Sequence, residues 1–216
     1  MIARVLAGAA LLFASSAAAF ACQGTSNPAL DENFKQPDPG WGETSDQYSS
    51  ASPQGLSMQP PVNGGWWWLN TNYTMDGSDV CLQIVMAAAP APTQGANGQP
   101  VSNDSDAGLL FWSKDAQNFY TATIAPDGSY GVYRLIAGKW TSIVAETPSP
   151  AIKTAAGSIN EVELTVSGNA GSFYINGTKV ADIHGQAPPD GGSPGIYCES
   201  GSAAATTWVF PRFQIY

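Results

Sequence analysis

Apolar and polar residues alternate over short runs along most of the chain, and no segment shows sustained helical periodicity. In 160–167, for example, Val162, Leu164 and Val166 share one face of a strand while the polar residues between them share the other. This pattern predicts an all-β protein. The expected strands are 66–70, 80–86, 108–113, 119–124, 130–135, 140–144, 160–167, 173–175, 179–183, 195–199 and 207–215, with a long exposed loop at 87–103.

Turn residues separate these runs. Asp127-Gly128 and Asn176-Gly177 supply the positive φ angles that tight hairpins need, and Ala137-Gly138 makes another turn. Turn signals every 8–12 residues or so are typical of a sandwich or barrel. We therefore expect an antiparallel β-sandwich.

The N-terminus has the three parts of a secretory signal peptide. Arg4 supplies the positive charge, 5–13 is a short apolar run, and small residues lead to an A-x-A-like cleavage site at Ala19-Phe20-Ala21. Cleavage there predicts a periplasmic or secreted protein whose mature chain begins at Cys22. The expected division is a signal peptide over 1–21, a short segment over 22–29 and one domain over 30–216.

The three cysteines leave their pairing open. Cys81 and Cys198 could form a disulfide in an oxidising compartment, and the alternatives are free buried thiols or a pair that includes Cys22. Alternation opposes the first option, because Cys81 shares a face with Gln83 whereas Cys198 shares one with the apolar Ile196. A lipid anchor on Cys22 is a further alternative, which the missing leucine three residues before the cleavage point disfavours.

Composition excludes some functions. The net charge is −9, which opposes nucleic-acid binding because phosphates require clustered Lys and Arg. Beyond the signal, no apolar run is long enough to predict a transmembrane helix. With 44% hydrophobic and 12% charged residues, the chain can bury a core and carries little charged surface.

Several strands resemble those of the concanavalin A-like lectin/glucanase superfamily. The segments are "DAGLLFW" at 106–112, "NEVELTV" at 160–166, "GSFYINGTKVADI" at 171–183, "GIYCESG" at 195–201 and "WVFPRFQIY" at 208–216. Their order is similar to laminin-G-like modules and to the 3-keto-disaccharide hydrolase domain, which often carries a "family 16 glycoside hydrolase" label. The resemblance covers about 30–216 and implies a jelly roll that binds glycan on its concave sheet.

The catalytic motifs of these relatives are missing. The sequence has no E-x-D-x-x-E strand, and the place of the His-Gly pair before the last strand reads Glu199-Ser200-Gly201. Glu161 and Glu163 share a strand face about 7 Å apart, which is the spacing of alternate strand residues, and we interpret them as a polar face. His184 is the only histidine and is expected at the end of a strand. No catalytic residue is assigned, and enzymatic activity stays open.

Aromatic residues are the main candidates for sugar stacking. In Trp66-Trp67-Trp68, neighbours must point to opposite faces, so we expect Trp67 inward and Trp66, Trp68 and Asn70 outward. The alternative is that a loop covers that outer face. The further candidate ligand-binding residues are Trp112, Tyr120, Arg134, Tyr197 and Glu199.

Two loop segments, 76–79 and 103–106, cluster oxygen ligands of the kind that calcium prefers, although short Asp/Asn/Ser runs are also ordinary turns. We therefore expect no cofactor and keep calcium as an alternative. The sequence as a whole predicts an exported carbohydrate-interacting module. The alternatives are a glycoside-acting enzyme of the 3-keto-disaccharide hydrolase type and a laminin-G-type protein-interaction domain.

Overall fold

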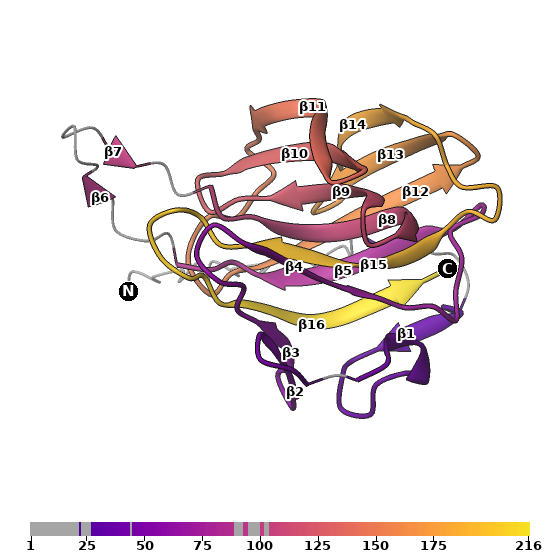
Figure 1. Ribbon diagram of the computed structural model, residues 1–216, viewed down its shortest axis with the longest axis horizontal. Coiled ribbons are helices and arrows are strands. Elements are labelled where there is room, and N and C mark those ends of the chain that lie inside the picture. The colour runs from indigo at the N-terminus through magenta and orange to yellow at the C-terminus, as the bar shows by residue number, and fades with distance from the viewer. Residues whose placement is uncertain (1–21, 23–26, 44, 89–92, 95–99, 102–103) are drawn as a thin grey trace, which may run out of the picture.

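The computed structural model describes residues 22, 27–43, 45–88, 93–94, 100–101 and 104–216, which form two packed antiparallel sheets (Figure 1). The predicted signal peptide and its cleavage site lie outside the described residues. In the part of the chain that is described, no helix is long and apolar enough to cross a membrane.

The larger sheet has eight strands in the order β14-β13-β12-β5-β16-β3-β2, with β1 paired to β16. Its members are β1 (Leu30–Glu32), β2 (Ser49–Ser52), β3 (Gly55–Met58), β5 (Asp79–Val85), β12 (Ile159–Ser167), β13 (Ala170–Ile175), β14 (Thr178–His184) and β16 (Trp208–Ile215).

The smaller sheet has six strands in the order β11-β10-β9-β8-β15-β4. Its members are β4 (Gly65–Leu69), β8 (Ala107–Asp115), β9 (Asn118–Ile124), β10 (Ser129–Ile136), β11 (Lys139–Pro148) and β15 (Ser193–Glu199). Outside the two sheets lie a short 3-10 helix, η1 (Pro39–Trp41), and a small pair, β6 (Thr93–Gln94) with β7 (Pro100–Val101).

The predicted strands are all present, with ends that differ by a few residues. The hairpin between β13 and β14 turns at Asn176 and Gly177, whose φ angles are 49° and 79°, as the sequence predicts. The sequence did not predict β1, β2 or β3, because those strands are short and lack a clear alternation. The pair β6 and β7 falls inside the segment that was expected to be a loop.

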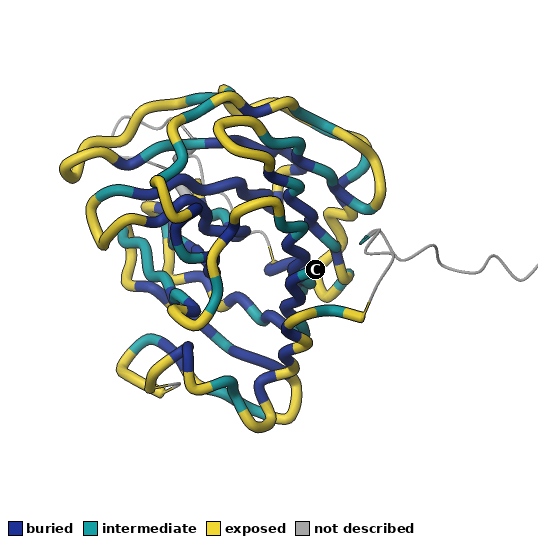
Figure 2. The backbone as a smooth tube through the Cα atoms, turned by 90° about the vertical axis from the view of Figure 1, so that its right-hand side faces the viewer, coloured by how far each residue is buried: buried dark blue, intermediate teal, exposed yellow. Residues whose placement is uncertain are grey.

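Apolar side chains from the inner faces of both sheets form one core. Figure 2 marks the buried residues in dark blue along the backbone. On β5 the predicted alternation is confirmed: Val80, Leu82 and Ile84 are fully buried in this core. On β15 the same holds for Ile196 and Cys198. Tyr197 and Glu199 therefore face the opposite way, onto the outer surface of the six-stranded sheet.

Of the pairings that the sequence left open, the tentative Cys81–Cys198 disulfide is wrong and a pair that includes Cys22 is right: Cys81 forms a disulfide with Cys22, and Cys198 is a buried free thiol. The reason is strand alternation. Cys198 points into the core from the six-stranded sheet, whereas Cys81 lies on the outer face of the eight-stranded sheet, so the core separates them. Because the disulfide uses the Cys22 sulfur, that sulfur cannot also carry a thioether-linked lipid.

Candidate functional site

A hollow lies on the outer face of the six-stranded sheet, and strand alternation creates it. On β9, Tyr120 and Ala122 point into the core, so Thr121 and Thr123 point outward. Thr123 is flanked in register by Gly108 on β8 and by a second glycine, Gly131, on β10. With no side chain on either neighbour, the sheet surface is low at this point.

Gly131 also shapes one wall of the hollow. A Cβ atom at this position would lie 2.6 Å from the ring of Tyr133, which is too close for any real contact. The Tyr133 ring therefore lies over the glycine, and glycine is required for it to do so. An added methyl group would displace the ring.

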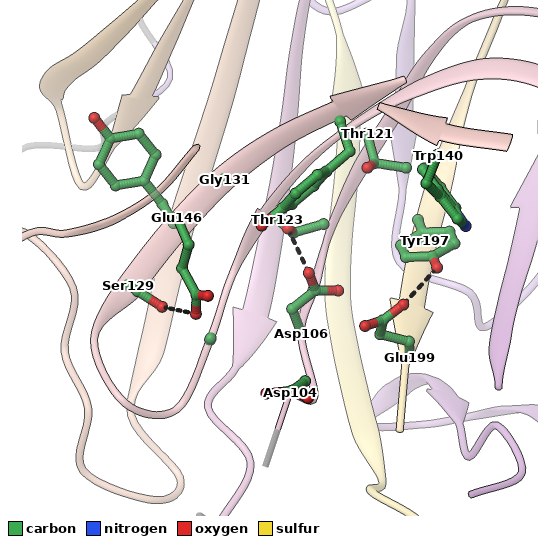
Figure 3. Close-up of a pocket in the computed structure, with 13 residues that line it drawn as sticks. Asp104, Asp106, Thr121, Thr123, Ser129, Gly131, Trp140, Glu146, Tyr197 and Glu199 are labelled. Atoms are coloured by element: carbon green, nitrogen blue, oxygen red, sulfur yellow. Dashed lines mark hydrogen bonds between the residues drawn. The ribbon is translucent and has the colours of Figure 1, made fainter. Parts of the chain in front are cut away.

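The hollow is a cavity of about 240 Å³ that combines carboxyl groups, hydroxyl groups and aromatic rings (Figure 3). This volume is below the roughly 300–1,000 Å³ of pockets for drug-sized ligands and suits a small group. The lining residues are Asp104, Asp106, Thr121, Thr123, Ala125, Ser129, Tyr130, Gly131, Tyr133, Trp140, Glu146, Tyr197 and Glu199.

Two of the carboxyl groups lie directly opposite each other. Cys198 pairs with Ala107, and the Glu199 amide donates to the Asp106 carbonyl, so Glu199 and Asp106 form the next pair along the two strands. Directly opposite residues have Cβ atoms about 4.5–5.5 Å apart. In Figure 3 the two carboxyl groups extend toward one another from neighbouring strands.

Each of these carboxyl groups has one hydroxyl donor. Thr123 Oγ1 donates to Asp106 Oδ2 at 2.7 Å, and the Tyr197 hydroxyl donates to Glu199 Oε2 at 2.8 Å. These contacts fix the orientation of both groups. The other oxygen of Asp106, Oδ1, is buried and has no hydrogen-bond partner in the structure.

Burial raises the pKa of both acids. For Asp106, burial raises the pKa well above its ordinary value, and the Glu199 charge raises it further. For Glu199, burial again raises the pKa, against the hydrogen bond from Tyr197, which lowers it. At an effective dielectric constant of about 20, two full charges about 5 Å apart repel by roughly 3 kcal/mol, so the pair favours holding a proton.

The other lining residues include two more carboxyl groups and no basic side chain. Glu146 Oε1 lies 2.8 Å from the Ser129 hydroxyl, and Asp104 is exposed at the rim. None of the lining residues is Lys, Arg or His. Burial of Tyr133, together with the carboxyl groups around it, raises the pKa of its phenol to about 12.

Aromatic rings form the side of the pocket next to β15. Trp140 is 47% exposed, and its indole packs edge-on against Tyr197, with ring centroids 5.7 Å apart. Phe119 supports both rings from below, and Trp67 packs against Phe119 at 5.5 Å. An exposed indole therefore stands on a rigid aromatic base beside the acidic cavity.

Of the candidate residues from the sequence, this cavity contains Tyr197 and Glu199. The expected orientation of the tryptophans is wrong: Trp68 is buried in the core, while Trp67 lies on the outer face with Phe119. All three positions are apolar, so hydrophobicity could not show which face is the inner one. Register decides it, because Trp67 lies opposite the outward-facing Tyr197.

Two further candidates from the predicted strand 66–70, Trp66 and Asn70, form hydrogen bonds within the protein. The indole of Trp66 donates to Asp46 Oδ2 at 3.1 Å. Asn70 is fully buried rather than outward, and its side-chain amide donates to Asp38 Oδ1 at 3.1 Å. Asn70 therefore helps to join η1 to the end of β4.

Trp112, Tyr120 and Arg134 lie together elsewhere, at a separate cavity of about 270 Å³. The Arg134 guanidinium lies 5.0 Å from the centroid of the Tyr120 ring and donates to Gln186 Oε1 at 2.9 Å. Trp112 and Tyr120 are both buried, so large parts of their rings belong to the core. Glycan binding by these three residues stays a prediction.

Among the described residues, no group of three or more His, Cys, Asp or Glu is arranged to hold a metal ion. Of the two proposed calcium segments, 76–79 is described in full, and Asn103 of the other lies outside the described residues. The Asp106 end of that second segment contributes its carboxyl group to the acidic pocket instead.

The sequence analysis missed most of the pocket: Asp106, Glu146, Tyr133 and Trp140. Asp106 lies one residue before β8, and its closeness to Glu199 depends on the pairing of β8 with β15. Only one signal was available, namely Trp140 standing among polar neighbours in a predicted strand. The remaining residues needed the strand order.

No family model matches the sequence, and no curated protein matches it. Solved structures do match. The carbohydrate-binding module CBM66 from Bacillus subtilis has a TM-score of 0.56 and 18% identity over 76% of this chain and 88% of that one. The Bacillus licheniformis β-glucanase has a TM-score of 0.58 and 10% identity, over 88% and 98%.

A third match is LamAcat from Zobellia galactanivorans, with a TM-score of 0.56 and 10% identity over 88% of this chain and 97% of that one. The fold is that of the concanavalin A-like lectins and glucanases. At these identities the matches establish the fold alone. The Cys22–Cys81 disulfide is typical of proteins in an oxidising, extracytoplasmic compartment.

Proposed function

We propose that this protein binds a glycan on the outer face of its six-stranded sheet, with one sugar ring held in the acidic pocket. The observation that carries this proposal is a single cavity that joins carboxyl oxygens to the exposed indole of Trp140. A sugar ring presents hydroxyl donors at its rim and C–H groups on its face. The cavity offers an acceptor for the first and an aromatic surface for the second.

Trp140 would supply the stacking surface. Among the described residues, four large hydrophobic side chains are exposed: Val62, Ile136, Trp140 and Ile159. Trp140 is the aromatic member of that set, and Tyr197 and Phe119 hold its ring in place. A held ring loses little conformational entropy when a ligand packs on it, which favours binding.

The carboxyl groups would supply the polar contacts. Glu146 and Glu199 each keep acceptor capacity beyond their hydroxyl donors, and Asp106 Oδ1 has no partner at all. A sugar hydroxyl that donates to Asp106 Oδ1 would satisfy a buried acceptor that otherwise costs stability. One of the matched structures is a carbohydrate-binding module, which agrees with this proposal.

The proposal is tested by titrating the purified protein with immobilised and soluble glycans and comparing Trp140→Ala with Ile159→Ala. Ile159 is 48% exposed and lies in the other sheet, so its variant is a control for the loss of an equally exposed apolar side chain. We expect Trp140→Ala to weaken binding about tenfold or more and Ile159→Ala to leave it unchanged. Equal effects, or no glycan binding at all, would overturn the proposal.

A second candidate function is glycoside cleavage, which the Asp106–Glu199 pair favours. Glycosidases use two carboxyl groups, one of which keeps a proton at neutral pH because its surroundings raise its pKa. Asp106, whose pKa burial raises well above its ordinary value, fits the role of the carboxyl group that keeps its proton. Release of reducing sugar by the wild type that disappears in both Asp106→Asn and Glu199→Gln would support an enzyme, and binding without turnover would support a module.

A further inference from the structure

The acidic pocket contains many carboxyl groups and no basic group, which is unusual for a site that binds a neutral sugar. Four carboxyl groups line it, those of Asp104, Asp106, Glu146 and Glu199, and no lining residue is basic. The described salt bridges, Lys179–Asp182 and Arg212–Asp31, lie on the eight-stranded sheet and involve none of these acids. The negative charge of the pocket therefore has no counter-charge from the described part of the protein.

The arrangement of Asp106 and Glu199 makes this imbalance costly. They lie directly opposite each other across β8 and β15, and directly opposite like charges destabilise a sheet. A neutral sugar hydroxyl can satisfy one oxygen but leaves the repulsion in place. A bound cation removes the repulsion and can also donate to the unpartnered Asp106 Oδ1.

The surroundings favour an organic cation over a metal ion. The acids do not converge as metal ligands do, since no metal-binding group of three was found among the described residues. The rings of Tyr133, Trp140 and Tyr197 line the same cavity. Carboxylates next to aromatic faces are the setting in which proteins bind ammonium groups, through hydrogen bonds and cation–π contacts.

We infer that the pocket selects a sugar that bears a free, protonated amino group, with the ammonium placed between Asp106 and Glu199 and the ring packed against Trp140. The inference rests on the proposed glycan-binding function and specifies its ligand class. An acetylated amine cannot fill this role because it carries no charge and less donor capacity. A uronic acid is excluded because its carboxylate would be repelled by all four acids.

Three oligosaccharides of equal length and linkage test the inference directly: β-1,4-linked tetramers of glucosamine, N-acetylglucosamine and glucose. Their affinities for the full chain are measured by calorimetry at about pH 7. We expect the glucosamine tetramer to bind at least about tenfold more tightly than either other tetramer, as a charge-assisted hydrogen bond to a carboxylate provides. Equal or tighter binding of the glucose tetramer would overturn the inference while leaving the proposed function intact.

Failure of all three tetramers to bind, with another glycan bound in the Trp140-dependent manner, would also overturn the inference alone. Spermidine separates a sugar site from a general amine site. We expect spermidine to bind at least about tenfold more weakly than the glucosamine tetramer, because it has no ring to pack on the indole. Equal binding of spermidine would overturn the assignment to a sugar.

Two variants locate the ammonium. Glu199→Gln and Asp106→Asn keep the size of each side chain and remove its charge, and Glu43→Gln makes the same change at an exposed position outside the pocket. We expect the first two to reduce the preference for the glucosamine tetramer over the glucose tetramer to about twofold or less, and Glu43→Gln to retain the preference. Retention of the preference in both pocket variants would overturn the inference, and thermal unfolding of each variant verifies that it is folded.

Discussion

One pair of acidic residues lies on the outer face of each sheet, and the two pairs differ in whether the chain covers them. Glu161 and Glu163 alternate along β12 on the eight-stranded sheet, whereas Asp106 and Glu199 face each other across two strands of the six-stranded sheet. By sequence the first pair looks more like a site, because both carboxyl groups lie on one regular strand. The structure places the cavity at the second pair.

The difference lies in what covers each pair. The Cys22 amide donates to Glu161 Oε1 at 2.7 Å, and the Gln83 side chain donates to Glu161 Oε2 at 3.3 Å. Glu163 lies opposite Cys81, the partner of Cys22 in the disulfide, and is buried. Cys22 thus attaches to the first pair, whereas within the part of the chain that the structure describes no N-terminal residue attaches in this way to the second pair. A carboxyl pair is available to a ligand when the fold leaves its face uncovered.

The largest expected effect is loss of that attachment. Replacing Cys22 and Cys81 together by serine removes a disulfide that joins residues 59 positions apart. Loop-closure entropy for this length corresponds to about 4 kcal/mol of unfolding free energy. Urea unfolding of the double variant against the oxidised wild type measures it, and a loss below about 1 kcal/mol would show that the segment contributes little to holding the face closed.

A smaller effect is expected from Glu161→Ala. This variant removes the acceptor for Cys22 and Gln83, so we expect a loss of about 1–2 kcal/mol in unfolding free energy. Glu43→Ala, at an exposed position, is the matched control and should change stability by less than about 0.5 kcal/mol. If Glu161→Ala leaves the unfolding free energy unchanged, the Cys22 contact does not distinguish the first acidic pair from the second, and the contrast between them is lost.

The strands of this fold could be predicted because alternation and turn residues are local. Val80, Leu82 and Ile84 mark the inner face of β5 without any knowledge of its neighbours, and Asn176-Gly177 marks the hairpin between β13 and β14 in the same way. The short N-terminal strands were missed because they pair with β16 and with each other through few residues.

The site could be predicted only in part because it depends on strand order. Tyr197 and Glu199 were found, since their outward orientation follows from alternation with Ile196. Their partners come from the residues just before β8 and from β9, β10 and β11, which the sequence does not place beside β15. The predicted orientation of the three tryptophans was wrong for a related reason. Both faces of β4 are apolar, because Trp67 packs on an aromatic cluster outside the core.

Removing the charges of Asp106 and Glu199 should raise the free energy of unfolding, whereas removing the Glu161 carboxyl group should lower it. In the double variant Asp106→Asn with Glu199→Gln, the repulsion between the two carboxyl groups disappears, while Thr123 and Tyr197 keep acceptors for their hydroxyl groups. We expect a gain of about 1 kcal/mol in unfolding free energy at about pH 7. A loss instead would show that the charged pair stabilises the fold, contrary to its opposed geometry.

The smallest effect, and the most specific, is the pH dependence of that gain. The ordinary pKa values are 3.8 for Asp106 and 4.5 for Glu199, and the folded protein raises both. Between the ordinary and the raised values the folded state binds more protons than the unfolded chain. The contribution of the pair to stability is therefore fully present below the ordinary values and is lost as pH rises through the raised ones.

This direction of the pH dependence distinguishes Asp106 and Glu199 from the exposed Asp31. The pKa of Asp31 is lowered by its hydrogen bonds with Arg212, so its contribution is lost as pH falls below about 4, in the opposite direction. Urea unfolding of the wild type from about pH 2 to pH 8 should show stability falling with pH above about pH 4. In the Asp106→Asn, Glu199→Gln variant that fall should flatten while the acid-side loss remains, because the variant leaves Asp31 and Arg212 intact. Parallel profiles for the two proteins would mean that folding does not raise the pKa of either carboxyl group, contrary to the burial of the pair.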